Sequence, residues 1–175
     1  MDHSCSFGPA LSLGLQFADQ RSVGSELAGT RSGQLFVAEA SAGYNSLIGS
    51  VAFTTTTGDR ITKPWGGDPS YNSLMISDFD SPDENTFRVG LSCDFKDIGL
   101  PGFSAFTNYA WGNSPDSGPN ATPDQQEFNV TFDFRPDVGE LRSFWLRFRY
   151  GYNDRESGGI SRNDFRVIAN YSIDF

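Results

Sequence analysis

This chain of 175 residues has almost no lysine, one histidine and two cysteines. Lys63 and Lys96 are its lysines, and His3 is its histidine, so no Ser/His/Asp or Cys/His catalytic arrangement can be assembled on regular elements. Cys5 and Cys93 lie far apart and have neither metal-site nor redox spacing. We therefore expect no enzymatic activity and no cofactor.

Basic charge and long apolar runs are also missing. The formal net charge of -9 argues against a nucleic-acid partner, because phosphate binding needs a basic surface. No apolar run approaches the roughly 18 residues of a membrane-spanning helix, and no helical period of 3.6 is visible. Mean hydropathy is -0.40, yet 14% of the residues are aromatic. This combination indicates apolar surface spread thinly over many alternating β-strands.

Alternation of apolar and polar residues with a period of two recurs along the chain. In EFNVTFDFR, Phe128 and Phe132 fall on one face and charged, amide and hydroxyl side chains on the other. The segment at 34–44 is the least clear, because Leu35 and Val37 fall on its otherwise polar side. About eight strands are predicted, over residues 10–19, 34–44, 46–55, 86–95, 103–111, 127–135, 143–152 and 163–175.

The connections between these segments alternate in length. Short ones lie near residues 43–45, 96–102 and 136–141, and longer polar ones lie near 20–32, 58–85, 112–124 and 154–162. Consecutive antiparallel strands with tight turns at one rim and long loops at the other form an up-and-down barrel. We therefore expect an all-β, antiparallel fold of this kind.

The composition of the polar faces predicts which side of the sheet meets water. An aqueous exterior favours Lys and Glu, whereas these strands carry Arg, Asp, Asn, Ser and Gly, which suit a packed, hydrated lumen. Aromatic residues near the strand ends, such as Trp111 and Tyr152, suit a membrane–water interface. We therefore expect a transmembrane β-barrel with its apolar face toward lipid. A soluble ligand-binding barrel with its apolar face inward is the alternative.

Two long stretches add a family resemblance. PWGGDPSYNSLMISDFDSPDENTFRVGLSCDF and the following KDIGLPGFSAFTNYAWGN, together residues 64–113, resemble the OprD family of substrate-specific outer-membrane porins. The stretch QQEFNVTFDFRPDVGELRSFWLRFRYGYND and the closing NDFRVIANYSIDF are similar to the last strands of that family. The resemblance covers residues 11–175 and implies an outer-membrane channel for small solutes.

The resemblance also bears on the extent of the chain. Members of this family form barrels of about eighteen strands, more than twice the number available here. Residues 1–9 form a leader segment in which no signal peptide is visible. The expectation is a single barrel domain, or barrel fragment, over 1–175 that corresponds to the C-terminal part of such a porin. A small closed eight-stranded membrane barrel with a structural or binding role remains the other membrane alternative.

Lumen arginines are the site that the resemblance implies, because the family guides substrate carboxylates along a ladder of them. A guanidinium is always charged and matches a carboxylate with two hydrogen bonds. The alternative is that these arginines pair with neighbouring acids and brace the wall, and both roles can hold together. The predicted pore-lining residues are Arg88, Arg135, Arg147, Arg149 and Arg166.

The long connection at 58–85 is expected to be an extracellular loop that narrows the pore, as such loops do in the family. Its DFDSPDE stretch lacks the glycine and the late glutamate of an EF-hand, so an acidic solvated loop is favoured over a calcium site. The predicted selectivity residues are Asp68, Asp78, Asp80 and Asp83.

The expected partners follow from the same resemblance. They are outer-membrane lipid and small solutes, either carboxylates or amino acids. The barrel-insertion machinery is a further expected partner, because it reads an aromatic residue at the end of the last strand, here Phe175.

Overall fold

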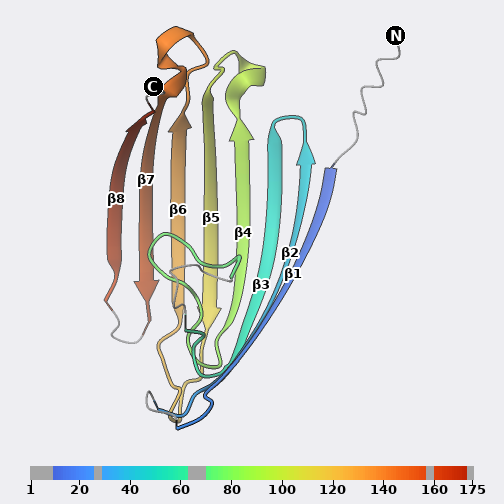
Figure 1. The fold of residues 1–175 in the computed structure, drawn as a ribbon, viewed down its shortest axis with the longest axis vertical. Coiled ribbons are helices and arrows are strands. Elements are labelled where there is room, and N and C mark those ends of the chain that lie inside the picture. Colours follow the sequence, from blue (N-terminus) through green and yellow to red (C-terminus); the bar gives the residue numbers. More distant parts are fainter. Residues whose placement is uncertain (1–9, 26–28, 63–69, 157–159, 173–175) are drawn as a thin grey trace.

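The computed structural model describes residues 10–25, 29–62, 70–156 and 160–172, and folds them into one eight-stranded antiparallel sheet (Figure 1). The strands follow the period-two segments of the sequence because alternate side chains point to opposite faces. They are β1 (Ala10–Arg21), β2 (Ser32–Tyr44), β3 (Leu47–Gly58), β4 (Asn85–Asp94), β5 (Phe103–Asn113), β6 (Gln125–Phe134), β7 (Phe144–Arg155) and β8 (Arg162–Tyr171).

The strands lie in the sheet in the order in which they occur in the chain. Each one pairs antiparallel with its sequence neighbours, from β1 beside β2 to β7 beside β8. The expected all-β, up-and-down arrangement of eight strands is confirmed. β1 and β8 lie at opposite edges and do not pair, so the described sheet is open and does not form a small closed barrel (Figure 1).

The two rims of the sheet differ as the loop lengths predict. The upper rim in Figure 1 holds the tight connections, two of which contain short 3-10 helices, η1 (Phe95–Ile98) and η2 (Gly139–Ser143). Asp94 caps η1 by accepting a hydrogen bond from the Lys96 amide at 3.0 Å. Gly99 ends η1 with φ +85°, a conformation that favours glycine. No helix in the described part of the chain is long and apolar enough to span a membrane.

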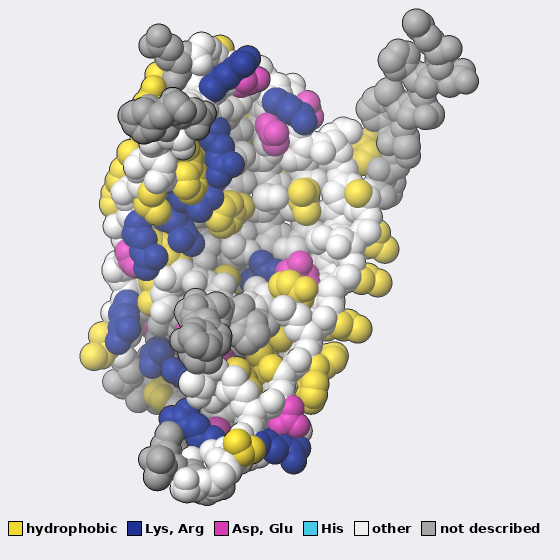
Figure 2. Space-filling view, in the orientation of Figure 1, with side chains coloured by type: hydrophobic (Ala, Val, Ile, Leu, Met, Phe, Trp, Pro, Cys, Tyr) yellow, Lys and Arg dark blue, Asp and Glu magenta, His cyan; other side chains and the backbone are white. Residues whose placement is uncertain are grey.

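The apolar side chains lie on the uncovered face of the sheet. Leu11, Leu13 and Leu15 of β1 are 73–75% exposed. Figure 2 shows hydrophobic side chains projecting outward along the right-hand edge of the sheet. Polar residues such as Thr54, Thr131 and Glu127 are instead buried on the opposite face. A soluble barrel would bury the apolar face and expose the polar one, so the soluble alternative is wrong. Lipid is the environment that suits this surface.

A small apolar cluster on the polar face accounts for the ambiguous pattern at 34–44. Leu35 and Val37 of β2 point to the polar side, where Ile61 from the β3–β4 connection packs against them. Ala18 and Tyr71 complete the cluster. Leu35 and Val37 therefore break the alternation because they pack against the β3–β4 connection and do not face water.

Candidate functional site

The β3–β4 connection folds back over the polar face of the sheet. Residues 59–62 and 70–84 of this connection are described, and we call residues 70–84 the docked loop; in Figure 1 it crosses in front of the strands. Ser77 Oγ donates to Gln125 Oε1 of β6 at 2.5 Å, and Asn72 Nδ2 donates to the Thr86 carbonyl of β4 at 3.2 Å. The docked loop is thus hydrogen-bonded to β6 and to β4. It covers part of the polar face of the sheet.

Glu127 of β6 makes the most concentrated contact with the docked loop. Its carboxylate accepts hydrogen bonds from the backbone N–H groups of Met75, Ile76 and Ser77 at 2.8, 3.0 and 2.8 Å. The side chain is fully buried. Alternation along the strand predicts Glu127 on the polar face but does not reveal what its side chain touches, so its contact with the loop could not be predicted from the sequence.

Two of the predicted pore-lining arginines are braced by acids of the wall. Arg88 of β4 pairs with Glu39 of β2 and donates to Asn108 Oδ1 of β5 at 2.7 Å. Arg147 of β7 forms two hydrogen bonds of 2.7 Å with the Asp133 carboxylate of β6. Arg88 thus links β4 to β2 across β3 and to the adjacent β5, and Arg147 links β7 to the adjacent β6. This is the bracing role that the sequence left open.

Arg149 and Arg166 have a different arrangement. They are direct partners in the β7–β8 register, and like charges directly opposite each other destabilise a sheet. Arg166 pairs with Asp164 on its own strand and donates to the Met75 carbonyl of the docked loop at 3.1 Å. Among the described residues, Arg149 donates one side-chain hydrogen bond, to the Thr131 hydroxyl at 3.3 Å, and forms no salt bridge. Asp164 and Glu127 act on it electrostatically.

Arg135 lies outside the strand in which the sequence placed it. β6 ends at Phe134, so Arg135 falls at the short-turn rim. Its guanidinium stacks over the Trp145 ring at 4.6 Å, and Arg147 stacks over the same ring at the same distance. Figure 2 shows Lys and Arg side chains along the left side of the face in view, from the upper rim to the lower rim.

The predicted selectivity acids are held within the loop region. Asp78 accepts from the Ser73 hydroxyl at 2.9 Å, and the buried Asp80 pairs with Arg60 at 3.0 Å. Asp83 accepts from the Gly58 amide and from Asn120 Nδ2 at 2.8 and 2.7 Å. Asp68 lies outside the described residues. Among those that are described, no group of three or more His, Cys, Asp and Glu residues is placed to hold a metal ion.

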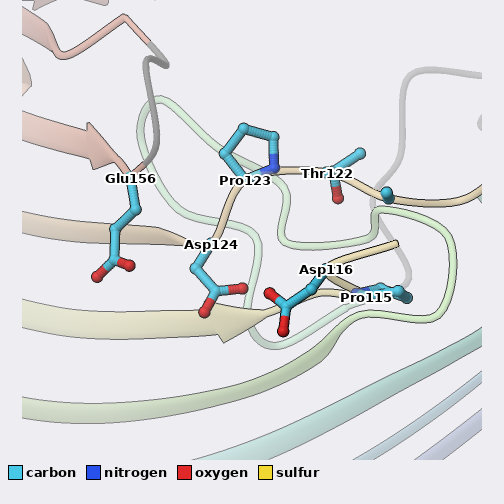
Figure 3. A pocket seen from close by; sticks show the side chains of 7 residues that line it. Pro115, Asp116, Thr122, Pro123, Asp124 and Glu156 are labelled. Atoms are coloured by element: carbon cyan, nitrogen blue, oxygen red, sulfur yellow. The ribbon is translucent and has the colours of Figure 1, made fainter. Parts of the chain in front are cut away.

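A pocket of about 260 Å³ opens among the loops at the opposite rim (Figure 3). Asp116, Asp124 and Glu156 are among the residues that line it, and Figure 3 shows their side chains. Asp124 accepts from the Ser114 amide at 2.8 Å and from Asn113 Nδ2 at 3.0 Å, so it also stabilises its own loop. The long-loop rim therefore presents acidic side chains at this pocket, whereas the inner wall formed by β7 and β8 presents arginines.

Together these features describe a wall with a lipid-facing apolar side, a charged inner side and a loop folded over it. A family model described as outer membrane porin, OprD family, matches residues 1–175. This chain belongs to the OprD family of outer membrane porins. Its location is therefore the bacterial outer membrane, and the family is one of channels.

Solved structures of OprD-family porins share the fold. Pseudomonas aeruginosa OccK9 (OpdG) superimposes with a TM-score of 0.86 at 21% identity, covering 94% of this chain and 43% of that one. A BenF-like porin from Pseudomonas fluorescens Pf-5 gives 0.85 at 20% identity, covering 93% and 43%. Pseudomonas aeruginosa OpdK with vanillate gives 0.85 at 20% identity, covering 93% and 44%. No curated protein matches this sequence.

This OprD-family chain spans less than half the length of those porins. The eight described strands therefore match part of the barrel wall of those porins. Residues 1–9, Cys5 and Phe175 lie outside the described residues, so recognition of Phe175 by the insertion machinery stays a prediction.

Proposed function

We propose that this porin wall guides small carboxylate-bearing solutes, amino acids among them, by passive diffusion across the outer membrane, without bond chemistry. In this proposal the long-loop rim, including 58–85, faces the exterior, and the short-turn rim faces the periplasm. The docked loop with Asp68, Asp78, Asp80 and Asp83 narrows the lumen beside the basic wall.

The placement of Arg149 is the observation that carries the proposal. Arg149 is paired with Arg166 in the strand register and forms no salt bridge among the described residues, although Asp164 and Glu127 act on it electrostatically. Placing two cations opposite each other costs stability, so an anion that enters between them relieves repulsion and gains charge-assisted hydrogen bonds. Arg147 lies two residues along β7, about 7 Å away, and extends the track.

The predicted arginines divide into two roles under this proposal. Arg149 and Arg166 contact the solute, whereas Arg88 and Arg147 chiefly hold their strands while adding positive potential. Arg135, stacked on Trp145 at the short-turn rim, lies where solutes leave the track. The structure of OpdK with vanillate supports the substrate class, since vanillate is an aromatic carboxylate.

The proposal is tested by permeation in proteoliposomes that contain this wall within a complete barrel, with its β1 and β8 edges paired to further strands. Benzoate should enter faster than its neutral amide, and Arg149→Gln should slow benzoate entry about twofold to tenfold, because one charge-assisted interaction is lost. The amide should be unaffected.

Arg142→Gln is the matched control, because Arg142 is an exposed arginine of the short-turn rim that pairs with Asp137. It should leave both rates unchanged. Equal entry of benzoate and its amide would refute carboxylate guidance, and an equal effect of both variants would remove Arg149 from the site.

A further inference from the structure

The tip of the docked loop forms a cup of three consecutive backbone N–H groups around one carboxylate. Met75 donates to Glu127 Oε1, Ser77 donates to Oε2, and Ile76 lies between them at 3.0 and 3.3 Å from the two oxygens. Successive N–H groups that converge in this way form an anion-binding concavity. Here the anion is a side chain of the channel's own wall.

Burial makes this contact selective for a carboxylate. Glu127 is 0% exposed, and a buried charge is tolerated only when several donors compensate for its lost hydration. Besides the three N–H groups, Asn129 Nδ2 lies 3.3 Å from Oε1. The same bonds satisfy the three N–H groups of the loop, so wall and loop depend on each other at this point.

Small residues of the wall allow the loop to approach this closely. A Cβ atom on Gly151 of β7 would lie 3.2 Å from Ile76 and 3.3 Å from Met75. A Cβ atom on Gly14 of β1 would lie 2.7 Å from the Tyr71 hydroxyl. Glycine at both positions therefore leaves the room that the loop side chains occupy.

The loop tip also reaches the basic wall. The Met75 carbonyl accepts a hydrogen bond from Arg166, and Glu127 acts electrostatically on both Arg149 and Arg166. Fixing residues 75–77 on Glu127 thus fixes the distance between the docked loop and the arginine track.

We propose that Glu127 is the positioning residue of the pore constriction, holding residues 75–77 of the docked loop beside Arg149 and Arg166 and so setting the width of the passage. The inference rests on the proposed channel function. Glu127 acts through the loop, and the solute does not bind to it.

Limited proteolysis of the intact protein in detergent micelles tests the positioning role without any transport measurement. Glu127→Gln replaces one acceptor oxygen with an amide donor that faces a backbone N–H. Chymotryptic cleavage after Leu74 and Phe79 should become about tenfold to a hundredfold faster, because cleavage follows the population of the undocked loop. Glu127→Asp keeps the carboxylate and should restore part of the protection.

Asp133→Asn is the control for cleavage, since Asp133 is another buried acid on the same face of β6 but contacts Arg147 and not the loop. It should leave the cleavage rate within twofold of the parent. Heat-modifiable electrophoretic migration identifies the variants that retain a folded barrel. A folded Glu127→Gln variant cleaved at the parental rate would overturn the proposal.

Single-channel recordings of the same variants test the constriction. Glu127→Gln should give larger and more variable conductance than the parent, because the loop no longer holds one position. A freed loop with unchanged conductance would overturn the constriction role. These recordings use the chain within a barrel that is completed by further strands paired with β1 and β8. If that barrel shows no channel, the proposed function fails, while the cleavage result still decides whether Glu127 positions the loop.

Discussion

At the scale of single residues, Gly112 lies on β5 where the docked loop comes closest to the wall. A Cβ atom there would overlap Glu84 Oε1 and lie 3.0 Å from Phe79. We predict that Gly112→Ala displaces the loop and destabilises the folded protein by about 1–3 kcal/mol, as overpacking does. Gly49→Ala is the control, because its Cβ would meet nothing within 4 Å. Loop proteolysis and urea unfolding followed by tryptophan fluorescence measure the difference.

Arg147 and Arg149 lie two positions apart on β7, yet we predict that their replacement has different effects on stability. Arg147→Gln breaks a two-bond pair and leaves Asp133 nearly buried without its cation, so the free energy of unfolding should fall by about 1–3 kcal/mol. Arg149→Gln removes repulsion from Arg166 and should change it by less than about 0.5 kcal/mol, or raise it. Urea unfolding of both variants in the same micelles measures this. An equal loss of stability in both variants would contradict the assignment of Arg147 to strand bracing and of Arg149 to solute contact.

At the scale of elements, the docked loop is sensitive to pH through Glu84. Burial raises the pKa of this carboxyl above its ordinary value of 4.5, and hydrogen bonds from Gln125 and Ser81 only partly oppose the shift. The docked state therefore binds the proton more tightly than the undocked state does. The stabilisation is complete below the ordinary pKa and is lost as pH rises through the raised one.

Hydrogen exchange of the amides of residues 70–84, corrected for the intrinsic pH dependence, should show this effect. We predict that protection falls as the pH rises above the ordinary carboxyl pKa of 4.5. Glu84→Gln should weaken this fall in protection. The variant therefore distinguishes the effect of Glu84 from that of Glu127, which binds the same loop. The pKa of Asp83 is lowered by its bonds to Asn120 and Gly58, so its effect is confined to pH values below 3.8. An identical pH profile in Glu84→Gln would contradict the role of Glu84.

At the scale of the whole molecule, the open edges of β1 and β8 dominate the behaviour of the sheet. Unpaired backbone groups within lipid cost several kcal/mol each, so a membrane sheet needs further strands or closure. Closure of eight strands on themselves would leave an interior filled by side chains, and the docked loop already occupies that side. The related porins form larger barrels, and a larger barrel contains the further strands with which edges such as these can pair.

We therefore predict that the 175-residue chain alone gives no sustained openings of porin size in planar lipid bilayers. OpdK, a family member of about twice the length, serves as the positive control for the same recordings. Stable, long-lived openings from the isolated chain would contradict this expectation and would require closure by another route.

Strand positions, face assignments and the two kinds of rim follow directly from the order of residues. Phe128 and Phe132 face outward and Glu127 and Thr131 inward because side chains alternate along any strand, wherever the strand lies in a fold. The environment of each face could also be predicted from composition. The polar side carries arginine without lysine, which favours a lumen over a surface exposed to bulk water.

The roles of individual polar residues depended on contacts between distant segments. Glu127 and Met75 are 52 positions apart, and no period or motif connects them. Arg147 and Arg149 look alike in the chain, but strand register gives one the Asp133 carboxylate and the other the Thr131 hydroxyl. Pattern along a strand is set by local geometry, whereas pairing of charges and docking of a loop are set by which strands become neighbours.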